Sequence, residues 1–248
     1  MPACSRAADK PPDVPGWRLV WHDEFGGREL DHTKWRPEDA ALEKNNEKQY
    51  YTPEDVYLEN GSLVLRSQDR PRGKRAYTSG LVETVGLFSQ RYGRFEVRAK
   101  LPRGRGIWPA HWLLPDDNSW PPEIDIMELL GHDPKRIYMT NHWRAPEGPR
   151  HEGRSFEGPD FTADFHTFTM EWDPDEIRWY VDGVQRHSTR KNVPDVAMRI
   201  ILNTAVGGNW PKDPDKTTLF PQYHFIDYVR VYVRDNIEFV DPPSGGVA

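Results

Sequence analysis

Residues 121–130 read Pro-Pro-Glu-Ile-Asp-Ile-Met-Glu-Leu-Leu, which sets three carboxylates, Glu123, Asp125 and Glu128, into one of the most apolar runs of a polar chain. In a β-strand, side chains two residues apart share a face, so Glu123 and Asp125 point the same way. Glu128 has the opposite parity. One extra residue at positions 126–127, forming a β-bulge, would turn Glu128 to the face of the other two acids. The stretch therefore predicts a bulged strand with three carboxylates on one side.

This acidic strand has two interpretations. An edge strand with solvated acids accounts for many acidic strands. The alternative is the carboxylate pair of a glycoside hydrolase, in which one carboxyl is the nucleophile and the other the general acid/base, with Asp125 between them. The alternation favours the second interpretation, because a solvated edge does not need isoleucine and leucine between its acids, whereas a buried sheet with one face turned to a cleft does.

The length of the chain is consistent with one domain. Its 248 residues allow one or two domains, and single all-β sandwiches often reach this size. The 19 glycines and 23 prolines suit many short strands joined by turns. No linker divides the chain, so we expect a disordered leader or tether at 1–15, one domain at 16–236 and a C-terminal tail at 237–248.

The charge of the chain argues against several classes of partner. A net charge of -6 provides no general attraction for nucleic acid or for an anionic membrane surface. No run of 18 apolar residues is present, so we expect no transmembrane segment. Residues 142–154 carry three arginines and could meet an acidic sugar, although a solvated loop is the simpler interpretation.

Turn signals predict hairpins and short strands. Asn60-Gly61 and Asp182-Gly183 each separate two alternating segments, which is typical of two-residue hairpins because both central positions of a type I′ turn need positive φ. Many short strands with scarcely any helical period favour a sandwich of two sheets. Further strands are expected at 78–90, 92–101, 106–114, 122–130, 136–143, 165–173, 198–205 and 223–234.

The acidic motif resembles the E-x-D-x-x-E signature of the laminarinases of glycoside hydrolase family 16, which is the bulged form of the motif. Seven further segments resemble that family and stand in the family's order: WHDEF at 21–25, LDHTKW at 30–35, NNEKQYY at 45–51, YGRFEVR at 92–98, GIWPAHW at 106–112, AVGGNW at 205–210 and DYVRVY at 227–232. The resemblance implies an all-β, concanavalin A-like β-jelly roll of two antiparallel sheets with a concave substrate cleft, and makes 16–236 the catalytic domain.

The resemblance also implies roles for individual residues. Glu123 would be the nucleophile, Glu128 the acid/base, and Asp125 an assistant that shares a proton or hydrogen bond with Glu123. The two catalytic carboxyls of a retaining enzyme should lie about 5–5.5 Å apart. The positions implied for substrate binding are Asn46, Trp108, Trp112, Trp120, His142 and Trp210.

Trp108 and Trp112 lie four residues apart on one predicted strand, so both should face the same side. There they could offer stacking surfaces to successive sugar rings, with core packing as the alternative for each. The family pattern has an arginine in the segment where this chain has Leu81, which implies a change in a sugar subsite more than in the chemistry.

A structural calcium ion is implied by the same resemblance, held by Glu24, the backbone near Gly61 and Asp227, whereas catalysis needs no cofactor. Ca²⁺ takes six to eight oxygen ligands, which carboxylates and carbonyls can supply. The single cysteine, Cys4, excludes an intrachain disulfide. The family is secreted, so we expect an extracellular monomer, with a lipid anchor on Cys4 as a further hypothesis.

The function expected from these observations is retaining, endo-acting hydrolysis of β-1,3-glucan of the laminarin type. Two alternatives within the family are hydrolysis of mixed-linkage β-1,3-1,4-glucan and of a β-galactan or another galactose-containing glycan. A non-catalytic carbohydrate-binding jelly roll is the alternative from another class. The glutamate pair argues against it, because a lectin has no need of Glu123 and Glu128.

Overall fold

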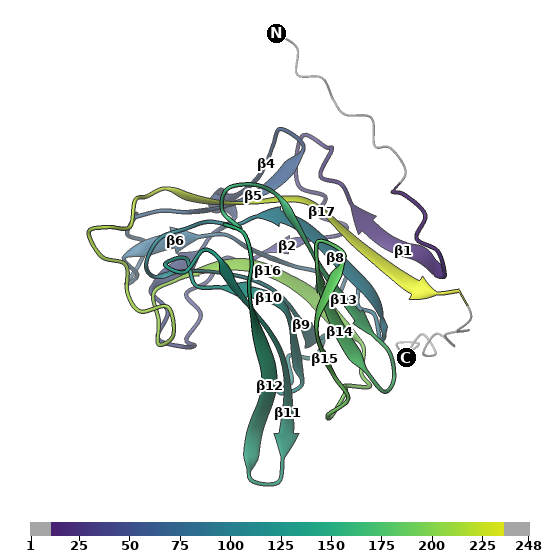
Figure 1. The fold of residues 1–248 in the computed structure, drawn as a ribbon. Helices are drawn as coiled ribbons and strands as arrows, with labels where there is room; N and C mark the ends of the chain where they lie inside the picture. The colour runs from purple at the N-terminus through teal and green to yellow at the C-terminus, as the bar shows by residue number, and fades with distance from the viewer. Residues whose placement is uncertain (1–10, 236–248) are drawn as a thin grey trace, which may run out of the picture.

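Two antiparallel sheets pack against each other in the computed structural model, which describes residues 11–235 (Figure 1). Sheet A has the spatial order β15 (Val184–Thr189), β14 (Ile177–Val181), β13 (His166–Trp172), β8 (Gly93–Lys100), β17 (Gln222–Arg234), β5 (Ser62–Ser67) and β4 (Val56–Glu59), and β1 (Trp17–Asp23) also pairs with β17. The all-β sandwich predicted from the sequence is confirmed.

Sheet B carries the acidic stretch near its middle. Its spatial order is β12 (Gly148–Glu157), β11 (Arg136–Ala145), β10 (Glu123–Leu129), β9 (Ile107–Pro115), β16 (Met198–Val206), β7 (Leu81–Glu83) and β2 (Arg36–Pro37). A short parallel pair, β3 (Gln49–Tyr51) and β6 (Tyr77–Ser79), and the 3₁₀ turn η1 (Pro53–Asp55) complete the elements.

The hydrophobic core lies between the two sheets because their strands turn alternate apolar side chains inward. Phe95 and Val97 of β8 meet Leu113 of β9 and Ile124 of β10 in one buried cluster. Burying an apolar side chain of this size stabilises the fold by roughly 1.5–3 kcal/mol. Strand β16 has nine buried residues out of nine, as expected for a central strand covered on both faces.

Both predicted two-residue hairpins are present. Asn60 and Gly61 have φ values of 52° and 76°, and they join β4 to β5. Asp182 and Gly183, with φ values of 50° and 75°, join β14 to β15. Positive φ at both central positions is the requirement of a type I′ turn, so the turn residues account for these connections.

The predicted loop at 142–154 is wrong. These residues belong to β11 and β12, which pair in continuous register from Arg136 opposite Glu157 to Ala145 opposite Gly148. Figure 1 shows the hairpin extending away from the body of the molecule. Most side chains of β12 are exposed, so no apolar alternation marked it as a strand.

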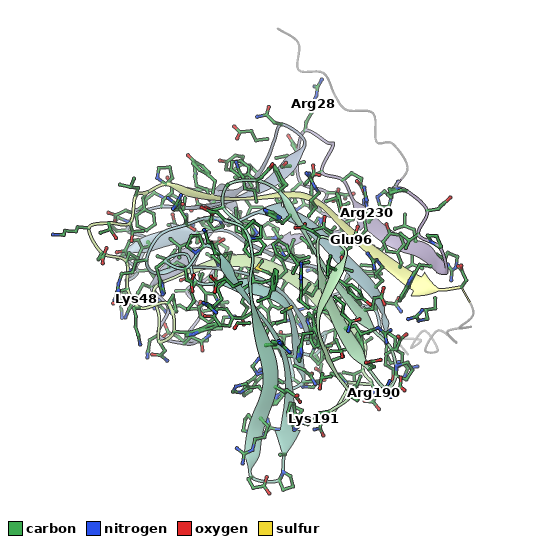
Figure 2. All side chains as sticks on the ribbon, in the orientation of Figure 1. Arg28, Lys48, Glu96, Arg190, Lys191 and Arg230 are labelled. Carbon is green, nitrogen blue, oxygen red and sulfur yellow. The ribbon has the colours of Figure 1, made fainter. Side chains whose placement is uncertain are left out.

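The base of this hairpin is tied to sheet A beside β15. Asn141 donates from Nδ2 to the main-chain oxygen of Lys191 at 2.9 Å, and Lys191, labelled in Figure 2, pairs through Nζ with Glu152 Oε2 at 3.2 Å. Thr189 donates a hydroxyl hydrogen bond to the same carboxylate at 3.2 Å. The hairpin therefore stands at a defined place relative to the rest of sheet B.

The predicted strand at 78–90 is shorter in the structure. Strand β7 ends at Glu83, and the following residues form a turn in which the amides of Leu87 and Phe88 donate to Thr84 O at 3.0 and 2.9 Å. Gly80 lies between β6 and β7, where its backbone is so close to that of Asp55 that a Cβ would lie 2.7 Å from Asp55 O. Turn hydrogen bonds and backbone crowding thus end what the sequence shows as one segment.

The ends of the chain are described only in part. Cys4, most of the expected leader and the tail at 237–248 lie outside residues 11–235. Within the expected leader, Pro11 is buried and Val14 forms a β-bridge with Trp17. No helix among residues 11–235 has the length and apolarity needed to cross a membrane.

Substituting Gly93 should destabilise the fold through one identified contact. Gly93 has φ +135°, and a Cβ there would lie 2.5 Å from Tyr232 O, whereas Gly73 has φ +60° with nothing within 4 Å of its Cβ position. We expect Gly93→Ala to lower the free energy of unfolding by about 3 kcal/mol and Gly73→Ala by about 1 kcal/mol, from backbone strain with and without overpacking. Urea denaturation measures both, and equal losses would contradict the steric argument.

Candidate active site

A cleft of about 1050 Å³ opens on the face of sheet B that is turned away from the core. It runs across β9, β10 and β11, and its walls include loop residues near 44–47 and at Trp210. All but one of the residues proposed for catalysis and substrate binding line it: Trp108, Trp112, Trp120, Glu123, Asp125, Glu128, His142 and Trp210. The exception is Asn46.

A β-bulge in β10 brings the three acids to this face. Asp125 pairs with Thr140 of β11, and the next pair is Glu128 with Tyr138, so β10 advances three residues while β11 advances two. The register on the β9 side also shifts just after Asp125. The bulge predicted at 126–127 is therefore confirmed, and Glu123, Asp125 and Glu128 all face the cleft.

Two nitrogen donors hold Glu123 and Asp125. Trp120 donates from Nε1 to Glu123 Oε2 at 3.0 Å. His142, opposite Glu123 on β11, has Nε2 2.9 Å from Asp125 Oδ2 and 3.5 Å from Glu123 Oε1. The imidazole thus lies between the two carboxylates and contacts both, with the shorter distance to Asp125.

Glu128 is held differently, by a single indole. Trp108 of β9 donates from Nε1 to Glu128 Oε1 at 3.0 Å. The Trp108 ring meets Trp210 edge-on at 5.5 Å between centroids, and Trp210 meets Tyr138 at 4.8 Å. Trp210 is 39% exposed, so one aromatic group of this cluster remains open to the cleft.

The pKa of Glu123 is raised by some of its surroundings and lowered, to a smaller extent, by others. Burial is the largest cause, and the charge of Asp125 adds to it. His142, Lys44 and the Trp120 hydrogen bond oppose the rise, because each favours the ionised carboxylate.

The surroundings of Glu128 raise its pKa with less compensation. Burial raises the pKa of Glu128 well above its ordinary value, and the charges of Asp125 and Glu123 raise it further. The hydrogen bond from Trp108 opposes them. Since no cation among residues 11–235 offsets the effect of burial on Glu128, we infer that Glu123 ionises before Glu128 as the pH rises.

The pKa of His142 is raised by its acidic neighbours. Burial acts to lower it, but the hydrogen bond to Asp125 and the charges of Asp125 and Glu123 outweigh burial. A positive imidazole in turn favours the ionised form of both carboxyls. The charges of Glu123 and Asp125 on β10 and of His142 on β11 therefore influence one another.

Around Trp112, the cleft also contains residues that were not proposed from the sequence, Lys44 and Asn203. Trp112 donates from Nε1 to Asn203 Oδ1 at 2.8 Å, and Asn203 donates to the Tyr51 hydroxyl at 2.9 Å. The ammonium group of Lys44 lies 4.6 Å from the centroid of the Trp112 ring. Leu81, which stands opposite Asn203 on β7, is buried.

Asn46 lies beside the cleft. Its amide donates to Asn209 Oδ1 at 2.7 Å, next to Trp210, while its neighbours Asn45 and Glu47 line the cleft. Buried Glu47 accepts from Asn45 at 3.0 Å and from Gln49 at 2.7 Å. The motif at 45–51 marked this segment, but left-handed φ values at both asparagines, 53° and 54°, decide which side chain turns inward.

The residues proposed for calcium lie on β17 or on segments beside it. Asp23 pairs with Val229 and Leu63 with Ile226; Glu24 follows Asp23 directly, Gly61 lies two residues before Leu63, and Asp227 lies between the two β17 partners. The Glu24 carboxylate accepts two hydrogen bonds from Arg230, at 3.0 and 2.8 Å. Asp227 Oδ2 accepts one from Arg98 at 2.6 Å. The oxygen donors suit Ca²⁺, but an ion there would compete with two arginines.

Comparison with known proteins adds independent findings. A family model described as glycosyl hydrolases family 16 matches residues 43–224. A beta-glucanase of Rhodothermus marinus is 38% identical, over 91% of this chain and 88% of the relative. A glucan endo-1,3-beta-glucosidase A1 of Niallia circulans is 34% identical over 89% of this chain, which spans 38% of that longer relative. The crystal structure of a laminarinase catalytic domain from Thermotoga maritima MSB8 superimposes with a TM-score of 0.81 and 41% identity, covering 87% of this chain and 98% of the domain.

Replacing His142 should change the titration of Glu123. His142→Asn removes a group whose charge lowers the pKa of Glu123, so that pKa should rise. His151→Asn is the matched control, because the His151 ring lies 5.6 Å from the His142 ring and makes no hydrogen bond to the acids in the described chain. Carbon-13 NMR titration of labelled glutamate, assigned with Glu123→Gln, would measure the change. An unmoved Glu123 titration in His142→Asn would contradict the proposed coupling.

Proposed function

The chain belongs to the glycosyl hydrolases of family 16, and from this premise we propose that its cleft cleaves internal β-1,3 linkages of glucan with retention of anomeric configuration. The observation that carries the proposal is the bulge in β10, because it turns Glu123 and Glu128 to one cleft with Asp125 between them. Retaining hydrolysis needs two carboxyls on either side of a glycosidic bond.

Glu123 is the proposed nucleophile and Glu128 the proposed acid/base. In the first step a Glu123 oxygen bonds to the anomeric carbon, the bond from that carbon to the leaving sugar oxygen breaks, and the Glu128 proton passes to that oxygen. In the second step Glu128 takes a proton from water, whose oxygen bonds to the anomeric carbon and releases Glu123. The two carboxyls supply both nucleophile and proton, so no cofactor enters the reaction.

The order of ionisation supports these roles. The nucleophile must be charged and the acid protonated at the same pH, so the acid must have the higher pKa. Burial, with less compensation, keeps Glu128 protonated after Glu123 has ionised. The acidic limb of the pH profile should therefore report Glu123 and the basic limb Glu128.

Asp125 and His142 are the proposed assistants of the nucleophile. Asp125 is almost completely buried, and its main-chain oxygen accepts from the Trp179 indole at 2.9 Å, which fixes the strand next to the bulge. His142 contacts both Asp125 and Glu123, so it can hold the positive charge that favours an ionised Glu123.

The proposed substrate, β-1,3-glucan, is supported by the names of the similar proteins, a glucan endo-1,3-beta-glucosidase and a laminarinase. The cleft supports a chain-like sugar ligand, because Trp120 and Trp210 are 46% and 39% exposed along it. Aromatic faces of this kind suit the apolar faces of sugar rings. Buried Leu81 offers no hydrogen-bond donor, so the subsite beside Trp112 depends on other groups.

Secretion and a structural calcium ion are further proposals. An extracellular location is supported by the proposed substrate, a polysaccharide. Calcium binding is supported by the oxygen donors that Glu24, Gly61 and Asp227 offer on and beside β17, and the Arg230 and Arg98 pairs count against tight binding through both carboxylates.

A panel of glucans tests the function. Laminarin and curdlan should release reducing ends much faster than lichenan, and agarose should be resistant, with β-configured first products by proton NMR. Glu123→Gln and Glu128→Gln should each lower kcat on laminarin by at least about 10²–10⁴-fold, because a nucleophile or a general acid is lost.

These variants keep the size of the side chain, so a folded circular dichroism spectrum and an unchanged Tm serve as their control. Near wild-type turnover by either variant, or an α-configured first product, would disprove the mechanism. Faster hydrolysis of lichenan or agarose than of laminarin would reassign the substrate and leave the chemistry in place.

Removal of calcium should lower thermal stability. If the ion is present at about 100 times its Kd, it stabilises the fold by about 2.7 kcal/mol, so EDTA should lower Tm by about 5–10 °C. Asp227→Asn should lower Tm in calcium and show little further change with EDTA. An identical Tm of the wild-type protein in excess calcium and in EDTA would remove the calcium proposal.

A further inference from the structure

We propose that Trp108 is a positioning residue that determines which oxygen of Glu128 carries the catalytic proton. This inference rests on the proposed function, in which Glu128 is the acid/base. Trp108 was selected from the sequence as a sugar-stacking residue, and its hydrogen bond to Glu128 points to a different task.

The Trp108 indole makes the one side-chain hydrogen bond that Glu128 has among residues 11–235, at 3.0 Å to Oε1. An indole N–H can only donate. In a protonated carboxyl, the carbonyl oxygen is the better acceptor and the other oxygen carries the hydrogen. Oε1 is therefore the carbonyl oxygen, and the proton lies on Oε2.

Two neighbours, one of them supported by a third residue, restrict the position of the Trp108 indole. Its strand pairs with β16, with Ala205 opposite Trp108. The ring meets Trp210 nearly at right angles, 88° between the planes, and Trp210 meets Tyr138 at 67°. The N–H direction is thus restricted by pairing with β16 and by the Trp210 ring, which Tyr138 of β11 contacts in turn, and this makes the indole an orienting group.

The two glutamates are supplied with different kinds of donor. Glu123 receives an indole N–H from Trp120 and lies 3.5 Å from the His142 imidazole, which can be charged. Glu128 receives a neutral indole alone. A charged donor favours an ionised carboxylate strongly, whereas a single neutral donor orients the carboxyl and leaves it able to hold its proton.

The same assignment serves both steps of the reaction. With Oε1 engaged by Trp108, Oε2 donates the proton to the leaving oxygen in the first step and accepts a proton from water in the second. The carboxyl does not need to rotate between the steps. A positioned general acid contributes about 10²–10⁴-fold to the rate, and Trp108 protects part of that contribution by holding the carboxyl in place.

Trp108→Phe tests the inference because it keeps an aromatic ring and removes the donor. We expect kcat on laminarin to fall by about tenfold or more, a part of the contribution of general acid catalysis. An aryl β-laminaribioside with a dinitrophenyl leaving group should lose much less, since that group leaves without protonation.

The basic limb of the pH profile should move to higher pH in Trp108→Phe. The groups that face Glu128 are Asp125 and Glu123 on its own strand, Tyr138 on β11 and Trp108 on β9. The variant removes the one among them that favours ionisation of Glu128, so its pKa rises. A purely structural role for Trp108 would lower activity without this shift.

Trp112→Phe is the matched control. Trp112 lies on the same strand and lines the cleft, but its indole donates to Asn203 and not to Glu128, so its replacement should raise KM and leave the basic limb where it is. If Trp108→Phe does not fold, incorporation of 3-benzothienylalanine at position 108 keeps the bicyclic shape and replaces N–H by sulfur.

The outcomes separate the inference from the function on which it rests. Wild-type turnover by Glu128→Gln would disprove the acid/base role itself. A second outcome concerns Trp108 alone. Glu128→Gln would be inactive on laminarin, while the donor-free variants at position 108 would lose equal activity on laminarin and on the activated glycoside and keep the basic limb in place. That outcome would overturn only the positioning role of Trp108.

Discussion

The bulge in β10 is the constraint on which the rest of the site depends. If β10 were regular, with no bulge between Asp125 and Glu128, strand alternation would send Glu128 toward the apolar core, where burial of a carboxyl is costly. Ile124, Met127 and Leu129 are fully buried on the opposite side of the same strand. Each such side chain stabilises the fold by roughly 1.5–3 kcal/mol, and together they hold the strand in the register that exposes the acids to the cleft.

Burial acts in the same direction on both glutamates but is opposed to different extents. The cleft removes both from water, which favours the neutral form of each. Only at Glu123 do an imidazole and a second donor offset that effect, because His142 stands opposite it on β11 and Trp120 precedes it in the chain. Two identical side chains in one cleft therefore differ in the groups that oppose the rise of their pKa.

Sheet A contributes to the site indirectly, by holding the hairpin of β11 and β12 in sheet B. His142 belongs to β11, and the base of the hairpin is held through Asn141 and Glu152 by the segment after β15 of sheet A. The position of the imidazole beside Asp125 thus depends on contacts made on the opposite face of the hairpin. A surface ion pair is worth little energy by itself, but here it adds to two hydrogen bonds and to the ten residue pairs between β11 and β12.

Much of this architecture follows from local sequence. Glycine after asparagine or aspartate placed both two-residue hairpins, and the spacing of the three acids placed the bulge, because turn φ values and strand parity are set by adjacent residues. The strand β12 escaped prediction because its side chains are mostly exposed and lack the apolar alternation that marks a strand.

The tertiary structure decided which distant residues meet the acids. Lys44 and Asn203 enter the cleft, Asn45 turns inward in place of Asn46, and Trp108 donates to a carboxylate rather than offering only a ring. These contacts depend on cross-strand register and on loop φ values. A sequence specifies its own local periodicity, whereas the pairing of strands far apart in the chain is set by packing of the whole sandwich.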